Sequence, residues 1–329
     1  MELELRGRNA VVAGGSRGIG RSIALAFARA GANVSICARG EPALRATEAE
    51  LRQCGRTVHA MSCDLGNGPA VSGYIEAAAK ALGGIDVLVN NASGFGSSDD
   101  EAGWAASINV DLLSTVRASH AAVPHLARNK GSIINISSTA GLKHSARNPP
   151  YGAVKAALVQ YTLTQAAKYA EKHIRVNCIA PGSIEFPGGS WERRKTTDPK
   201  LYASVFNRIR WGRLGTPDEV ANVALFFASS AASWVTGQTI AVAANGGPLT
   251  LNLLDQAMDL IPGTKIDAAV SRFPGAFIGR LKKYKAKDKL AEDFTKMMGE
   301  ASELAARGEK EAFELTGTDW PTRSEEHTS

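Results

Sequence analysis

Short apolar runs alternate with longer amphipathic stretches along the first 250 residues, and this rhythm limits the possible folds more than any other feature. The runs are rich in β-branched residues and nearly free of polar ones, as expected for strands covered on both faces. We predict strands at Asn9–Ala13, Asn33–Cys37, Thr57–Ser62, Asp86–Asn90, Ser132–Ser137, Arg175–Ile179 and Thr239–Val242. We predict helices at Ile19–Ala30, Pro42–Cys54, Pro69–Leu82, Glu101–Arg128, Tyr151–Lys172 and Pro217–Ser229.

This alternation predicts an α/β fold with a doubly wound parallel sheet in a single Rossmann-like domain. Sheets of this kind bind ligands beyond the carboxyl ends of their strands. We place the catalytic domain at residues 1–249 and a helical C-terminal extension, or a truncated second domain, at 250–322. Residues 323–329 read RSEEHTS, which resembles a translated sequencing-adapter oligonucleotide, and we interpret them as an artefact.

Composition and charge exclude several classes of function. The chain has 329 residues, 44% of them hydrophobic, which suits a full core, and a net charge of +6. Its basic residues are scattered without an interleaved aromatic stripe, so we expect no nucleic-acid partner. No apolar run reaches the roughly 18 residues of a membrane span, so we expect no membrane partner. Four cysteines without paired spacing and an N-terminus without an apolar leader predict a cytoplasmic protein, and we predict no metal site.

A glycine-rich loop follows the first predicted strand and opens the first predicted helix. Its glycines let backbone N–H groups approach a pyrophosphate, which the helix N-terminus also attracts. A glycine-rich loop alone can be a purely structural turn, but its place at the first strand–helix junction favours a dinucleotide site. The predicted cofactor-binding residues of this loop are Gly14, Gly15, Ser16, Arg17, Gly18, Ile19 and Gly20.

The end of the second predicted strand indicates which dinucleotide binds. No acidic residue is present there to accept the ribose 2′-hydroxyl of NAD, whereas Arg39, together with Arg17, is suited to hold the 2′-phosphate of NADP. We therefore predict NADP or NADPH as cofactor and consider NAD less favoured. The alternative is that Arg39 only caps a loop. Asp64 and Leu65, after the third strand, fit the adenine edge.

Three further residues predict acid–base chemistry. Tyr151 and Lys155 lie four residues apart at the start of a predicted helix and therefore share one face. Carbonyl reduction needs a proton donor near the acceptor oxygen, and a neighbouring ammonium group favours the ionised phenol. Ser138 ends the preceding predicted strand and could donate a hydrogen bond to the substrate oxygen. A tyrosine–lysine pair alone is a common structural feature of helix faces, but the three residues together favour a catalytic reading.

In this combination the chain resembles the short-chain dehydrogenase/reductase family, including members of the 3-oxoacyl-(acyl-carrier-protein) reductase type, from about Leu5 to Gly247. The matching residues are Gly14, Gly18, Gly20, Asp64, Asn90, Asn91, Ala92, Asn109, Ser138, Tyr151, Lys155, Pro181 and Gly182.

The resemblance implies a role for each matching side chain. Tyr151 would be the general acid and base, and Lys155 would also bind the nicotinamide ribose. Ser138 would position the substrate, and Asn109 would support a water molecule that relays protons toward Lys155. The resemblance also implies cofactor contacts for Asn91, Pro181, Gly182 and Ile184.

The resulting expectation is an NADP(H)-dependent oxidoreductase that acts on CH–OH groups and transfers a hydride between nicotinamide and a ketone or secondary alcohol. The substrate could be an acyl thioester, with 3-oxoacyl thioester reduction as one possibility. A substrate-covering lid is expected at residues 183–213, and a homodimer or homotetramer is expected from the resemblance. The alternatives are a non-catalytic NADP-binding sensor or scaffold, and the reductase half of a bifunctional fusion.

Overall fold

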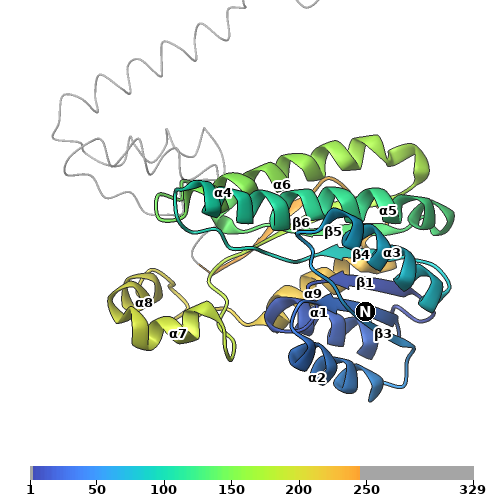
Figure 1. The fold of residues 1–329 in the computed structure, drawn as a ribbon, viewed down its shortest axis with the longest axis horizontal. Helices are drawn as coiled ribbons and strands as arrows, with labels where there is room; N and C mark the ends of the chain where they lie inside the picture. The colour runs from blue at the N-terminus through green and yellow to red at the C-terminus, as the bar shows by residue number, and fades with distance from the viewer. Residues whose placement is uncertain (1–2, 245–329) are drawn as a thin grey trace, which may run out of the picture. The chain divides into compact units, whose positions relative to one another are not determined.

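A computed structural model describes residues 3–244 and places all seven predicted strands in one sheet (Figure 1). Two of them, β1 and β7, have the predicted bounds, and the other five differ by a few residues at their ends. The bounds are β1 Asn9–Ala13, β2 Asn33–Ala38, β3 Val58–Ser62, β4 Val87–Asn90, β5 Ser132–Ile136, β6 Arg175–Pro181 and β7 Thr239–Val242. The expected C-terminal extension and the adapter-like residues lie outside the described part of the chain.

Every neighbouring pair of strands is parallel, in the order β3-β2-β1-β4-β5-β6-β7. The helices cover both faces, with α1 packed on α9 and α3 packed on α5 (Figure 1). The prediction of a doubly wound, Rossmann-like sheet is thus confirmed. The main covering helices are α1 Gly18–Arg29, α2 Glu41–Arg52, α3 Gly68–Leu82, α5 Ser114–Asn129, α6 Pro149–Lys168 and α9 Pro217–Ala228.

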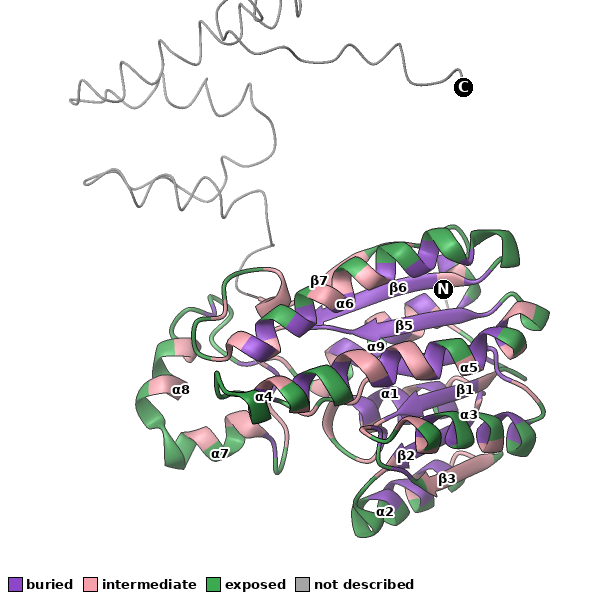
Figure 2. Cartoon of the chain, turned by 45° about the horizontal axis from the view of Figure 1, so that its top comes forward, coloured by how far each residue is buried: buried purple, intermediate pink, exposed green. Residues whose placement is uncertain are grey.

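The core lies in two layers because successive side chains of a strand point to opposite faces of the sheet. Val12 of β1 joins the layer that contains Phe27 of α1 and Phe227 of α9. Its neighbour Val11 joins the other layer, with Ile75 of α3 and other residues on that side. Figure 2 shows the central strands as buried along their lengths. Both faces being covered explains why the strands read as continuous apolar runs rather than alternating ones.

Two regions differ from the predicted elements. The single helix expected at 101–128 consists of α4 Glu101–Ala106, a π-helical turn η1 Ser107–Leu113, and α5. The expected lid contains two short helices, α7 Ser190–Thr197 and α8 Pro199–Phe206, which sequence periodicity did not predict. None of the helices within residues 3–244 is long and apolar enough to cross a membrane.

A buried network of polar side chains joins the middle of the sheet to the helices on one face. Asn135 of β5 accepts a hydrogen bond from Asn90 of β4 at 2.9 Å and donates to Thr162 and Gln165 of α6 at 2.9 and 3.0 Å. Asn90 also donates to Ser119 of α5. All five residues are buried, so each lost partner would leave a polar atom without water to replace it.

We predict that Asn135→Ala lowers the free energy of unfolding by about 3 kcal/mol, because it leaves buried amide groups unpaired and opens a small cavity. Urea denaturation monitored by circular dichroism measures this change. Asn207→Ala, at an exposed position after α8, is the control and should change stability by less than about 0.5 kcal/mol. A loss of under about 1 kcal/mol for Asn135→Ala would contradict a structural role for the network.

Candidate active site

The residues predicted for cofactor binding and catalysis follow the carboxyl ends of six neighbouring strands. The glycine loop follows β1, Arg39 follows β2 and Asp64 follows β3. On the other side of β1, Asn91 follows β4, Ser138 follows β5, and Pro181 with Gly182 ends β6. The sheet order changes direction between β1 and β4, and this is where doubly wound sheets bind ligands.

The glycine loop is held tightly by the strands beside it. Gly14 and Gly15 both donate backbone hydrogen bonds to the carbonyl oxygen of Cys37 at the end of β2. Asn91 Nδ2 donates to the Gly14 carbonyl oxygen at 2.7 Å. A Cβ atom at Gly20 would lie 2.1 Å from that same oxygen, so only glycine fits there. The loop therefore leads into the N-terminus of α1, where a Cβ atom at Gly18 would lie 2.5 Å from the Phe186 ring. A helix N-terminus of this kind attracts phosphate groups.

Two arginines beside this loop are exposed and cationic. Arg17 precedes α1 and Arg39 follows β2, and neither forms an ion pair within the described residues. The bonds from the glycine loop to Cys37 bring the end of β2, and so Arg39, to the same edge of the sheet. Asp64 is exposed after β3, whereas Leu65 lies in the core. The side chain of Leu65 is thus directed into the protein.

Lys155 is a buried cation at the centre of the site. It is 2% exposed, and its Nζ donates a hydrogen bond to the carbonyl oxygen of Ile136 at 3.0 Å. Nζ also lies 2.9 Å from Oδ1 of Asp111, which is itself buried. Burial by itself lowers the pKa of this ammonium group, but the charges of Asp111 and Tyr151 raise it, and the net pKa is above the ordinary value.

Tyr151 lies one turn before Lys155 in α6 and is half-buried. The Lys155 Nζ atom lies 5.5 Å from the centre of the Tyr151 ring. On its other side the ring packs against Phe95, with ring centres 4.9 Å apart and planes tilted by 58°. Phe95 is 40% exposed and has a backbone φ of 47°, which is unusual for a bulky residue. Sequence reasoning missed Phe95, because nothing in its local pattern marks this contact.

Ser138 is brought to Lys155 by the residues just before it in the chain. Ser137 Oγ donates to the backbone oxygen of Lys155 at 2.7 Å, which locks the end of β5 onto α6. The turn η2 Thr139–Gly141 packs on α6 so closely that a Cβ at Gly141 would lie 2.5 Å from the backbone of Lys155. Ser138 Oγ accepts from the Ala140 N–H at 3.1 Å, and its side chain is half-buried.

The structure does not bring Asn109 into this cluster. Asn109 is exposed on η1, while Asp111, two residues further on, is buried and contacts Lys155. The role expected for Asn109, supporting a water molecule, stays a prediction, and the side chain of η1 that contacts Lys155 is Asp111. The sequence held a signal for it, since Asp111 is the single charged residue between positions 102 and 116.

The far side of the site is formed by β6 and the segment after it. Gly182 donates a backbone hydrogen bond to the Val242 carbonyl oxygen of β7 at 3.0 Å, and Ile184 is buried. Ile184 also lines a hollow of about 180 Å³. In the expected lid, Tyr202 of α8 donates to Glu185 at 2.9 Å, so this contact ties α8 to the segment that follows β6.

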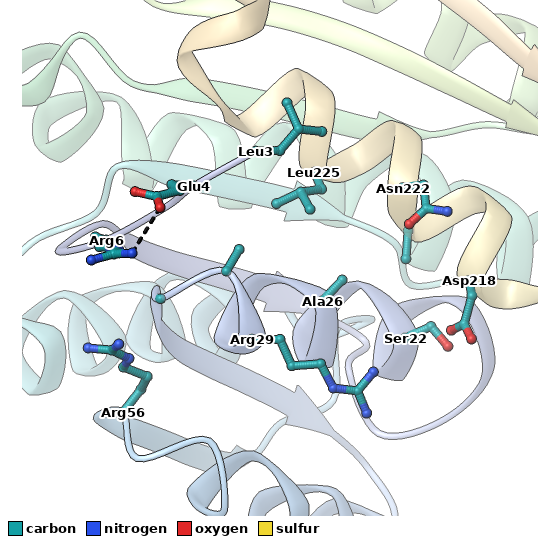
Figure 3. Close-up of a pocket in the computed structure, with 13 residues that line it drawn as sticks. Leu3, Glu4, Arg6, Ser22, Ala26, Arg29, Arg56, Asp218, Asn222 and Leu225 are labelled. Carbon is teal, nitrogen blue, oxygen red and sulfur yellow. Dashed lines mark hydrogen bonds and ion pairs between the residues drawn. The ribbon is translucent and has the colours of Figure 1, made fainter. Parts of the chain in front are cut away.

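A larger cavity, of about 790 Å³, lies elsewhere (Figure 3). It is lined by α1, α9 and the N-terminal segment, with Arg29 and Asp218 among its side chains. None of the residues predicted for catalysis or cofactor binding lines it. Within residues 3–244 no three His, Cys, Asp or Glu side chains gather in a way that could hold a metal ion.

Together these residues can perform proton transfer beside a bound dinucleotide. The glycine loop fits a pyrophosphate, and the two arginines fit a further phosphate group. Both features lie on the β1 side of the point where the sheet order changes direction. On the other side, the buried Lys155 ammonium group lies 5.5 Å from the centre of the Tyr151 ring, and Ser138 follows the residue that bonds to the Lys155 backbone. A phenol and a hydroxyl are groups that can exchange protons and hydrogen bonds with a carbonyl or alcohol oxygen.

Comparison with known proteins identifies the family that the sequence resembles. The family model described as "Enoyl-(Acyl carrier protein) reductase" matches residues 13–247. The 3-oxoacyl-(acyl-carrier-protein) reductase FabG of Chlamydia trachomatis is 36% identical over 244 residues, which cover 71% of this chain and 95% of that protein.

Two solved structures have the same fold. A 7 alpha-hydroxysteroid dehydrogenase complexed with NADH and 7-oxo glycochenodeoxycholic acid gives a TM-score of 0.70 at 33% identity, covering 75% of this chain and 96% of that one. The L-sorbose reductase of Gluconobacter frateurii, complexed with NADPH and L-sorbose, gives a TM-score of 0.69 at 28% identity, with coverages of 74% and 98%. The chain belongs to the short-chain dehydrogenase/reductase family of oxidoreductases.

Proposed function

We propose that this oxidoreductase transfers a hydride between NADP(H) and a ketone or secondary alcohol, with Tyr151 exchanging the proton. The observation that carries the proposal is the buried Lys155 ammonium group, 5.5 Å from the centre of the Tyr151 ring. When bound, the nicotinamide supplies or accepts the hydride. Tyr151 then donates a proton to the carbonyl oxygen during reduction, or removes one from the alcohol during oxidation.

Lys155 and Ser138 support that proton transfer in different ways. The positive charge of Lys155 stabilises the phenolate that Tyr151 becomes after donating its proton. Ser138 would donate a hydrogen bond to the substrate oxygen as negative charge develops there, and the bond from its neighbour Ser137 to the Lys155 backbone supports this role. The Phe95 ring against Tyr151 gives the site an apolar wall, which suits a hydrophobic substrate.

The preference for NADP rests on Arg17 and Arg39. Both are exposed and lack an ion-pair partner in the described chain. β2 and Arg39 contain no carboxylate to bind a ribose 2′-hydroxyl, and the first one after them, Glu41, pairs with Arg45. The relatives include proteins complexed with either dinucleotide, NADH in one case and NADPH in another, so family membership does not decide between them. The local charge favours a 2′-phosphate.

We predict that Arg39→Ala weakens NADPH binding by about tenfold or more, because a charge-assisted hydrogen bond to the phosphate is lost. NADH binding should stay within about twofold, since NADH has no 2′-phosphate. Isothermal titration calorimetry measures both. Arg29→Ala, an exposed arginine of α1 away from the glycine loop, serves as control. Equal losses of affinity for NADPH and NADH would contradict the proposed contact between Arg39 and the 2′-phosphate.

We predict that Tyr151→Phe lowers kcat by at least about 100-fold and leaves NADPH binding intact, because only the proton donor is removed. Steady-state oxidation of NADPH and a fluorescence titration provide the two readouts. Tyr161→Phe, on the same helix ten residues further on, should behave as the wild type. Normal turnover in Tyr151→Phe would exclude this tyrosine as the general acid.

The substrate class can be tested with a small panel of ketones, 3-oxoacyl thioesters and enoyl thioesters. The C. trachomatis relative is named for 3-oxoacyl reduction, whereas the matching family model is named for enoyl reduction. We predict NADPH-dependent reduction of a 3-oxoacyl thioester or of a hydrophobic ketone, with kcat/KM at least about 100-fold above that for the matching enoyl thioester, because an acid beside a serine donor suits a carbonyl oxygen. Faster reduction of the enoyl thioester would overturn the proposed reaction.

A further inference from the structure

The buried ion pair between Asp111 and Lys155 has no part in the proton transfer described so far. Both side chains are almost completely enclosed, with exposed fractions of 0% for Asp111 and 2% for Lys155. Enclosing one charge without a partner is costly, and a lysine in that position normally loses its proton. The charge on Lys155 therefore needs a specific explanation.

Asp111 is the carboxylate that faces this ammonium group. Cys178 of β6 also lies near Lys155, but burial raises the pKa of its thiol, which keeps it uncharged. Tyr151 also raises the pKa of Lys155, but only an ionised phenol carries a negative charge. The other elements packed on this part of α6, β5 and the turn η2, offer backbone and hydroxyl groups without charge.

The second oxygen of Asp111 fixes the orientation of the carboxylate. Oδ2 accepts a hydrogen bond from the Gly94 N–H at 2.8 Å. Gly94 lies in the loop after β4 and precedes Phe95, whose ring packs against Tyr151. Oδ1 has no hydrogen-bond donor aligned with it among the described residues, so its 2.9 Å approach to Nζ is an attraction between charges. Asp111 thus joins the loop after β4 to the ammonium group.

We propose that Asp111 is a positioning residue that keeps Lys155 protonated inside the protein and holds its ammonium group beside Tyr151. The consequence for catalysis rests on the function proposed above, but the charge state of Lys155 does not. Asparagine at this position would have one acceptor oxygen for two donors, the Gly94 N–H and Nζ. If its oxygen accepted from Gly94, its NH₂ group would face the ammonium group and disfavour the proton on Lys155.

The direct test follows the Lys155 side chain by NMR in protein labelled with ¹³C-lysine, with the signal assigned by its absence in Lys155→Met. In the wild type we expect Lys155 to remain mostly protonated at about pH 10, near the ordinary lysine midpoint. In Asp111→Asn we expect its midpoint to fall by about two pH units or more, as for other buried lysines without a counter-charge.

Asp86→Asn is a closely matched control. Asp86 Oδ1 lies 3.0 Å from Arg8, and its Oδ2 accepts from the Asn9 N–H at 2.8 Å. Asp86→Asn therefore removes an ion pair and changes an acceptor of a backbone N–H, as Asp111→Asn does. Asp86 is remote from Tyr151. The Lys155 midpoint and the turnover should be unchanged in this variant.

The outcomes separate the two proposals. A Lys155 midpoint in Asp111→Asn within about half a pH unit of the wild type would overturn the inference. If Asp111→Asn does not fold, the wild type alone decides, because a Lys155 midpoint below about pH 9 would show that Asp111 does not hold the proton there. The NMR readout needs neither cofactor nor substrate. Failure of the oxidoreductase function would instead appear as normal turnover in Tyr151→Phe.

A kinetic measurement then tests the link to catalysis. Alcohol oxidation requires Tyr151 to accept a proton, and a neutral Lys155 would no longer favour the phenolate. The rising limb of kcat/KM for alcohol oxidation should therefore move to higher pH in Asp111→Asn and stay in place in Asp86→Asn. If the rising limb of kcat/KM moved to lower pH instead, the Asp111 carboxylate would only reduce the effect of the Lys155 charge on Tyr151. That result would contradict the positioning role.

Discussion

An ammonium group enclosed by protein is the constraint around which the site is built. Lys155 receives one contact from each of three places: the Ile136 carbonyl oxygen at the end of β5, the Asp111 carboxylate on η1, and the Tyr151 ring on its own helix. Because the charge is buried, each contact acts in a medium of low dielectric constant and is stronger than it would be at the surface. A separate bond from Ser137 to the Lys155 backbone holds the end of β5 against α6.

The parallel sheet determines that this cluster meets a dinucleotide site. All seven strands run in one direction, so their carboxyl ends lie along a single edge, and the order changes direction between β1 and β4. The glycine loop after β1 and the Asn91 side chain after β4 face each other across this point and are joined by a 2.7 Å hydrogen bond. The residues proposed for proton transfer come from the β5 side of the same edge. The topology therefore brings the proposed catalytic residues close to the glycine loop.

Much of this arrangement could be predicted from the sequence, since it depends on local patterns. The strands were recognisable from short runs such as Asn9–Ala13, because residues buried on both faces are apolar throughout. The π-helical turn η1 could not be predicted, because such turns are rare and usually occur as single turns inside an α-helix. On this turn Asn109 is exposed and Asp111 is buried. The Phe95 contact depends on a rare backbone conformation that no spacing encodes.

The central claim is that hydride passes from the nicotinamide to a carbonyl carbon in the site beside Tyr151. The most direct measurement uses NADPH carrying deuterium at both C4 positions, with mass spectrometry of the alcohol formed from a ketone or 3-oxoacyl thioester. The account predicts one deuterium atom on the carbinol carbon of the product. A product without deuterium at that carbon, or with deuterium at a former alkene carbon, would contradict it.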